Sequence, residues 1–323
     1  MGRKYGGWLG WDELITHQRV VLLAEAKSGK TEEFLLRARA LRDQGKPSFF
    51  VRIEDLADGP LVTALTAEDE EQFKDWRAGK EPGWFFLDSV DEARLNTRSF
   101  ERALRQFRRD LGNALDRASV FISCRASDWR GHHDSNLVIS ELPPSLTNSL
   151  DAKPSSLDDL LLGPIFKDDS LQESDASSSA KKESITIVRL ADLNTAQRSA
   201  LARWAGIAET DLFIREINRH GLATLTERPG DLLELAAYWK AYGKFASFAE
   251  MTEFAIGQKL AERDPHRPDA STLNESRIRE GSERIAAALT LGKSLTLRIP
   301  GQEADPSLAT GALDAADILP DWT

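Results

Sequence analysis

Short apolar runs alternate with amphipathic helical patterns along the first 190 residues of the chain. The runs are rich in β-branched and aromatic residues typical of buried strands, and the segments between them repeat apolar residues at helical spacing. This alternation favours an α/β fold, with a parallel sheet covered by helices on both faces. The expected strand segments are 19–26, 47–56, 83–95, 118–129 and 183–193, and the clearest helical segments between them are 28–45 and 99–115.

Polar clusters come directly after several of these strands. In sheets of this kind ligands bind beyond the carboxyl ends of the strands, which meet at one edge. We therefore expect the clusters to lie at a common edge and to contact the same ligand.

The first cluster, AEAKSGKT at residues 24–31, is close to a phosphate-binding loop. The pattern is G-x-x-x-x-G-K-[ST] between a strand and a helix, in which backbone N–H groups and the lysine bind phosphates and the hydroxyl binds Mg²⁺. Only the opening glycine differs. The alternative is a strand–turn–helix that contains GKT by coincidence. The residues expected to bind a nucleotide are Ala24, Glu25, Ala26, Lys27, Ser28, Gly29, Lys30 and Thr31, with Thr31 also a metal ligand.

A second cluster follows the apolar residues WFFL. Asp88 ends this strand, which we expect to neighbour the strand before the phosphate loop, and its carboxylate is suited to hold Mg²⁺ directly or through water. Asp91 and Glu92 follow closely and are candidates to orient or deprotonate an attacking water. The alternative is a helix cap formed by Asp88 or Ser89.

Arg125 follows the apolar strand segment FISC. The planar guanidinium group matches phosphate oxygens, so Arg125 is a candidate catalytic residue that contacts the γ-phosphate. The alternative is an ion pair with a surface acid such as Asp128.

The composition changes after this point. Residues 134–183 are rich in Ser and Asp and poor in aromatic residues, which predicts a flexible insertion. From residue 191 to 270 helical patterns follow one another and predict a compact helical domain. The expected organisation is thus an α/β nucleotide-binding domain at 1–190, a helical domain at 191–270 and a further partial unit at 271–323.

Net charge and cysteine content argue against several classes of function and location. The net charge of −10 argues against non-specific binding of nucleic acid or anionic membrane, and one cysteine in 323 residues fits a reducing, cytoplasmic location. No apolar run is long enough to span a bilayer. A nucleic-acid translocase would need a basic track, for which Arg105, Arg108 and Arg109 are the only concentrated candidates.

Together, AEAKSGKT, FFLDSVDE, FISCR and the later ERPGDLLELAAYW resemble a STAND-class P-loop NTPase of the NACHT-like branch. The resemblance implies ATP and Mg²⁺ as cofactors, slow hydrolysis in a switch domain, a helical lid in which Pro229 lies near the base, and a winged-helix-like unit that begins within 271–323. It departs at Ala24 and Lys27, where the family usually has glycines, and at Cys124, where Thr or Ser is common.

Members of that class are usually longer, with effector and ligand-sensing regions. The resemblance therefore implies a truncated or short form, and its expected partners are a second copy in a homo-oligomer or the missing effector and sensor regions. Many bacterial relatives act in defence against phage. The competing hypothesis is a non-catalytic scaffold or interaction module whose phosphate loop has degenerated at Ala24 and Lys27.

Overall fold

The computed structural model describes residues 8–88, 99–145, 165–167, 185–261, 275–292, 297–298 and 312–320. The chain divides into two compact units. Unit 1 comprises Met1–Leu201 and Leu225–Asp231, and unit 2 comprises Ala202–Thr224 and Leu232–Thr323. Unit 1 thus includes two short segments of the mainly helical part of the sequence, residues 191–201 and Leu225–Asp231.

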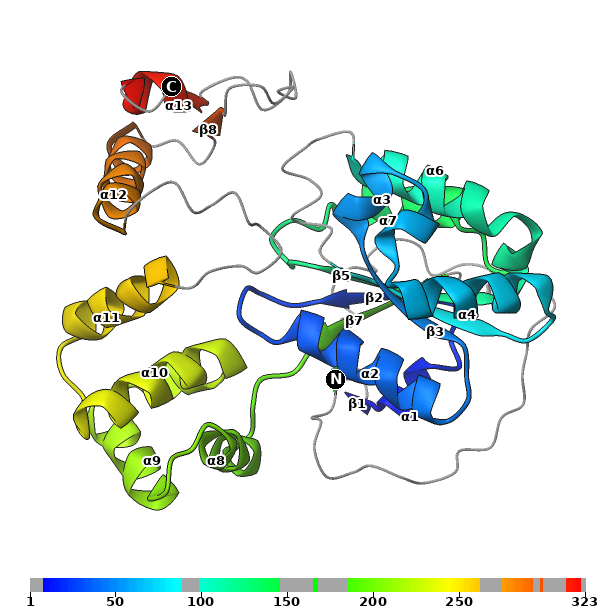
Figure 1. The fold of residues 1–323 in the computed structure, drawn as a ribbon. Helices are drawn as coiled ribbons and strands as arrows, with labels where there is room; N and C mark the ends of the chain where they lie inside the picture. Colours follow the sequence, from blue (N-terminus) through cyan, green and yellow to red (C-terminus); the bar gives the residue numbers. More distant parts are fainter. Residues whose placement is uncertain are drawn as a thin grey trace, which may run out of the picture. The chain divides into compact units, whose positions relative to one another are not determined.

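A seven-stranded sheet forms the centre of unit 1 (Figure 1). Its strands lie in the order β1-β6-β7-β2-β5-β4-β3, and every neighbouring pair from β7 to β3 is parallel. The predicted α/β fold with a parallel sheet is therefore confirmed. The parallel strands are β2 (Arg19–Leu23), β3 (Ser48–Arg52), β4 (Gly83–Asp88), β5 (Ala118–Cys124) and β7 (Thr186–Leu190).

Two short strands extend the sheet beyond β7. These are β6 (Ile165–Lys167), antiparallel to β7, and β1 (Trp8–Leu9), antiparallel to β6. The sequence did not predict them because segments of three and two residues are too short to show an alternating pattern.

Side chains of the central strands alternate between two hydrophobic layers. On one face, Leu22 and Phe86 pack with α1 (Trp11–Leu14) and α2 (Lys30–Asp43). On the other face, Leu23 and Phe85 pack with four further helices, and Figure 1 shows α2 and α6 on opposite sides of the sheet. These helices are α3 (Ile53–Asp58), α4 (Ala67–Ala78), α6 (Ser99–Leu111) and α7 (Gly131–Glu141).

Helix α7 occupies the first residues of the stretch 134–183, where composition led us to expect the start of a flexible insertion. Val138 and the following Leu142 are completely buried in the same hydrophobic layer as α6. The helix begins with the polar residues GHHDSN, so composition alone does not indicate its apolar face.

Helices follow β7, in agreement with the helical pattern expected after residue 190. Ring contacts among Phe213, Trp239 and Phe245 join α9 to α10 and to the loop after it. No helix in the described ranges is long and apolar enough to cross a membrane. The helices are α8 (Thr195–Trp204), α9 (Thr210–Arg219), α10 (Pro229–Tyr242), α11 (Phe248–Ala261) and α12 (Glu275–Gly292), followed by the parallel pair β8 (Leu297–Arg298) and β9 (Leu313–Asp314) and by α13 (Ala315–Ile318).

Trp11 fastens α1 to α2. Its Nε1 donates a hydrogen bond of 2.9 Å to Glu33 Oε2, and the guanidinium carbon of Arg37 lies 5.3 Å from the ring centre. Burial raises the pKa of the Glu33 carboxyl, while the nearby Arg37 charge and the Trp11 hydrogen bond oppose that rise. Folding thus makes the charged form of Glu33 less favourable than it is in water.

This raised pKa predicts a pH dependence of stability. The folded-state pKa of Glu33 lies above its reference value of 4.5, so the folded chain binds this proton more tightly than the unfolded chain. The contribution of Glu33 to the free energy of unfolding therefore falls as the pH rises from the unfolded-state pKa through the folded-state pKa. Glu33→Gln keeps an acceptor for Trp11 and does not titrate. Urea unfolding from about pH 4 to about pH 8 should show the variant gaining stability relative to the wild type; a difference that is constant with pH would contradict the expectation.

Candidate functional site

The turn between β2 and α2 contains two residues with left-handed backbone conformations. Gly29, the residue before α2, has φ 89°, a value that favours glycine. Lys27 has φ 64°, which costs a residue with a side chain about 1 kcal/mol. Ala24 does not have a positive φ, so the turn accepts alanine there without that strain. Of the two positions where the phosphate-loop family usually has glycine, only position 27 therefore has a strained backbone.

The start of α2 presents hydrogen-bond donors without partners in the helix. The Glu33 N–H donates to the Gly29 carbonyl at 2.9 Å, so the N–H groups of residues 30–32 precede the helical hydrogen-bond ladder, and Gly29 has no side chain to cap them. The Lys30 ammonium donates to the carbonyl oxygens of Ala24 at 2.9 Å and Glu25 at 3.2 Å. Backbone donors and one ammonium group therefore gather at this turn, as a phosphate group requires.

A hydroxyl and a carboxylate meet beside this helix start. Thr31 Oγ1 donates to Asp88 Oδ2 at 2.7 Å, and Ser123 Oγ donates to the other oxygen, Asp88 Oδ1. Asp88 is only 2% exposed. The structure thus brings together the side chains of Thr31 and Asp88, two oxygen groups of the type that Mg²⁺ prefers as ligands.

The expected adjacency of the strands is wrong, however. β4, which carries Asp88, pairs with β5 and β3, and β5 lies between it and β2. Apolar strand patterns do not reveal the order of strands in a sheet, so the gap was not foreseeable. Ser123 on β5 spans it, and the sequence reading did not identify this residue. The signal was a hydroxyl one position before the end of a buried strand.

Arg125 follows β5 directly and is half-buried. The preceding residue, Cys124, accepts a hydrogen bond of 3.1 Å from the N–H of Ala24, which ties the end of β5 to the start of the phosphate-loop turn. Since β2, β4 and β5 are parallel, Lys30, Asp88 and Arg125 all come at or after the carboxyl ends of their strands, at one edge of the sheet. Asp91 and Glu92 lie outside the described residues.

The segment at the start of α10 contacts the same turn within unit 1. A Cβ atom placed on Gly29 would lie 3.6 Å from Cγ of Pro229, so this proline lies against the phosphate-loop turn. The Gly230 N–H donates to the Lys27 carbonyl at 2.9 Å, and the Lys27 ammonium forms a 3.0 Å ion pair with Asp231. The sequence reading placed Pro229 at the nucleotide but did not identify Gly230 or Asp231. The acid next to PG in ERPGD was the available signal.

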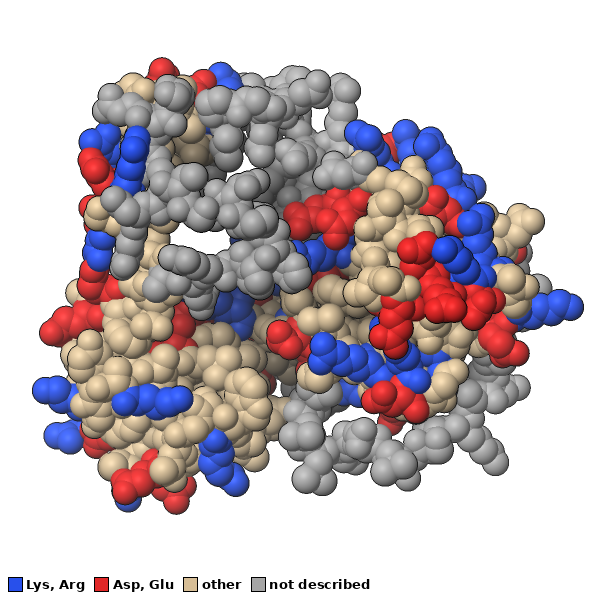
Figure 2. Space-filling view, in the orientation of Figure 1, with Lys and Arg blue, Asp and Glu red and all other residues tan. Residues whose placement is uncertain are grey.

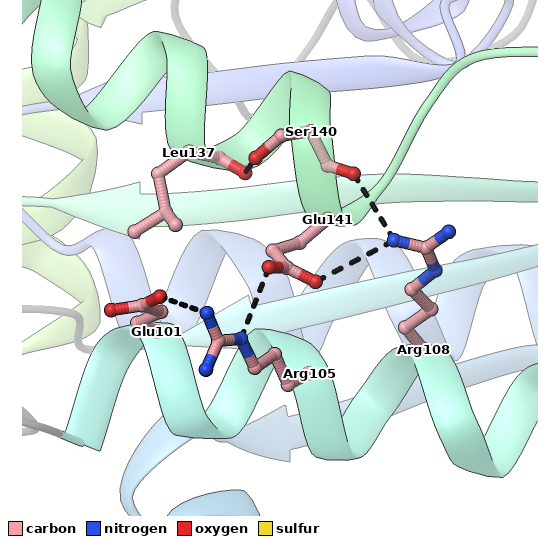
Figure 3. A network of polar contacts seen from close by, with 6 residues as sticks. All are labelled: Glu101, Arg105, Arg108, Leu137, Ser140 and Glu141. Carbon is pink, nitrogen blue, oxygen red and sulfur yellow. Dashed lines mark hydrogen bonds and ion pairs between the residues drawn. The ribbon is translucent and has the colours of Figure 1, made fainter.

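Two arginines of α6 that a nucleic-acid track would use contact protein groups instead (Figure 3). Arg105 pairs with Glu101 and, through Nε at 3.2 Å, with Glu141. Arg108 pairs with Glu141 at 3.6 Å and donates to the Ser140 carbonyl at 3.2 Å, near the end of α7. These contacts join α6 to α7. The face of the molecule in Figure 2 also carries Lys and Arg interspersed with Asp and Glu.

Comparisons with known proteins assign no family to the chain. No protein-family model and no curated protein matches it. A solved structure described as a DNA replication initiation factor is 12% identical, with 91% of this chain and 80% of that one covered and a TM-score of 0.37. A Walker-type ATPase of Pyrococcus abyssi is also 12% identical, with 95% and 85% covered and a TM-score of 0.37.

The hydrogen bond between Ser123 and Asp88 yields a stability prediction. Ser123→Ala removes a donor from a buried carboxylate, and we expect the free energy of unfolding of unit 1 to fall by about 2 kcal/mol. Ser123→Thr keeps the hydroxyl and should recover most of that loss. The matched control is Ser119→Ala on the same strand, at a partly exposed position where a change within about 0.5 kcal/mol is expected. Equal losses at the two serines, measured by urea unfolding, would contradict the assignment.

Proposed function

We propose that this chain is an ATP-binding, slowly hydrolysing P-loop NTPase in which the β2–α2 turn binds the phosphates of the nucleotide. The observation that carries the proposal is the 2.7 Å hydrogen bond between Thr31 and Asp88 at the start of α2, beside uncapped backbone donors. A strand–turn–helix with GKT by coincidence gives no reason for a buried carboxylate from a strand two positions away to meet that hydroxyl.

The residues present fit a triphosphate and Mg²⁺ chemically. The N–H groups at the start of α2 and the Lys30 ammonium are donors for phosphate oxygens, and Lys30 would exchange the carbonyls of Ala24 and Glu25 for them. Thr31 Oγ1 and Asp88 Oδ2 are hard oxygen ligands. When bound, Mg²⁺ neutralises charge on the β- and γ-phosphates.

The remaining roles are those that the sequence predicts, with Arg125 placed at the same edge as Asp88. Arg125 would contact the γ-phosphate and stabilise charge during transfer to water. Asp91 or Glu92 would orient or deprotonate the attacking water, with Ser123 fixing the carboxylate of Asp88 at the same time. Pro229 would contact the nucleotide from the start of α10.

We further propose that the chain acts as a switch of the STAND class, close to the NACHT branch. Support comes from AEAKSGKT, FFLDSVDE, FISCR and ERPGD, and from the contact of the last of these with the phosphate-loop turn. In this proposal residues 191–270 form the lid, 271–323 begin a winged-helix-like unit, and bound nucleotide changes the equilibrium between two arrangements only through contacts that differ between them. Defence against phage is the corresponding biological setting.

The competing proposal, a scaffold with a degenerate loop, is favoured by one observation. Lys27 holds a strained left-handed conformation where glycine would be relaxed, and its ammonium is paired with Asp231. Nucleotide binding separates the two proposals, because a scaffold would bind no ATP.

The test is ATP affinity measured by isothermal titration calorimetry with and without Mg²⁺. Wild type should bind ATP, Lys30→Ala should weaken binding about 100-fold under both conditions, and Asp88→Asn should weaken it about tenfold only with Mg²⁺ present. Lys74→Ala on α4, whose partner is Glu70 on the same helix, is the matched control and should leave affinity unchanged. Undetectable binding by the wild type with Mg²⁺ would overturn the proposal in favour of the scaffold.

A further inference from the structure

Lys27 and the start of α10 form a contact that the proposed chemistry does not use. The Lys27 ammonium lies 3.0 Å from Asp231 Oδ1, and the Gly230 N–H donates to the Lys27 carbonyl at 2.9 Å. A Cβ atom on Gly230 would stand 2.7 Å from Cβ of Lys27, so only glycine allows this approach. We call residues 228–231 the α10 clasp.

The clasp carries a carboxylate to the edge of a site that must receive a triphosphate. The side chain of Asp231 is only 12% exposed, and its two oxygens are shared between two cations: Oδ1 pairs with Lys27 and Oδ2 pairs with Arg228 Nε at 2.8 Å. A carboxylate in this position holds a cation of the turn that would otherwise be available to a phosphate group.

The backbone of Lys27 is strained, which indicates that the lysine side chain itself has a role at this position. Glycine at φ 64° would be free of the strain that a side chain brings there, and glycine would equally permit the hydrogen bond from Gly230 to the carbonyl of residue 27. What a lysine adds is the ammonium group, which Asp231 holds; the lysine side chain as a whole is 35% exposed.

We propose that Lys27 is exchanged between two anions: Asp231 holds its ammonium in the empty site, and a nucleotide phosphate takes it when bound. The inference rests on the proposed nucleotide site. Asp231 keeps Arg228 after the exchange, so no mostly buried charge is left without a partner. Asp231 is thus a positioning residue that lowers nucleotide affinity by holding the Lys27 ammonium in the empty site.

The direction in which one substitution changes ATP affinity tests this exchange. Asp231→Asn removes the competing charge, and we expect the intact chain to bind ATP·Mg²⁺ about five- to tenfold more tightly at low salt, an increase that structural damage would not produce. Glu70→Gln on α4 removes the same charge from an exposed ion pair and is the control, with unchanged affinity expected.

Repeating the Asp231→Asn change in a Lys27→Met variant separates the effect that acts through Lys27 from a general effect of the Asp231 charge on ATP affinity. In Lys27→Met the same Asp231→Asn change should alter ATP affinity less than about twofold, because the exchanged cation is absent. Equal tightening in both backgrounds would overturn the exchange, and so would weaker or unchanged binding by Asp231→Asn in the wild-type background. If neither wild type nor Asp231→Asn binds ATP, the proposed function itself fails; if both bind with equal affinity, only the exchange fails.

Discussion

The hydrogen bond from Thr31 to Asp88 is the contact on which the organisation of the site depends. It joins the first turn of α2 to the end of β4 across the intervening strand β5, and Ser123 on that strand fixes the second oxygen of the carboxylate. Because Asp88 is buried, these hydroxyl donors also stabilise a polar group that would otherwise be costly to remove from water. One carboxylate therefore connects the ends of two strands, β4 and β5, to the first turn of α2.

The two-layered core explains why this arrangement is rigid. Consecutive residues of β2 and β4 point into opposite hydrophobic layers, with α1 and α2 on one face and α3, α4, α6 and α7 on the other. The helix that presents the backbone donors is thus anchored along its buried side, by Phe34, Ala38 and Leu41. The turn before it, in contrast, combines a strained lysine with a contact from the start of α10.

Residue patterns alone predicted the parallel sheet and the grouping of Lys30, Thr31 and Asp88, since strand ends and loop chemistry are local properties. The patterns failed where the outcome depends on strand order or on distant pairing. Nothing in WFFLD shows that β5 separates β4 from β2, and nothing in FISC shows that Ser123 reaches Asp88. The pairing of Lys27 with Asp231, 204 positions apart in sequence, is likewise a product of the fold.

The most direct test of the central claim is the position of a metal in crystals grown with ATP and Mn²⁺, located by anomalous scattering. The account predicts a single strong peak within about 2.5 Å of Thr31 Oγ1, with the carboxylate of Asp88 next to it and the triphosphate on the β2–α2 turn. Ordered nucleotide elsewhere, or a metal peak away from Thr31 and Asp88, would contradict it.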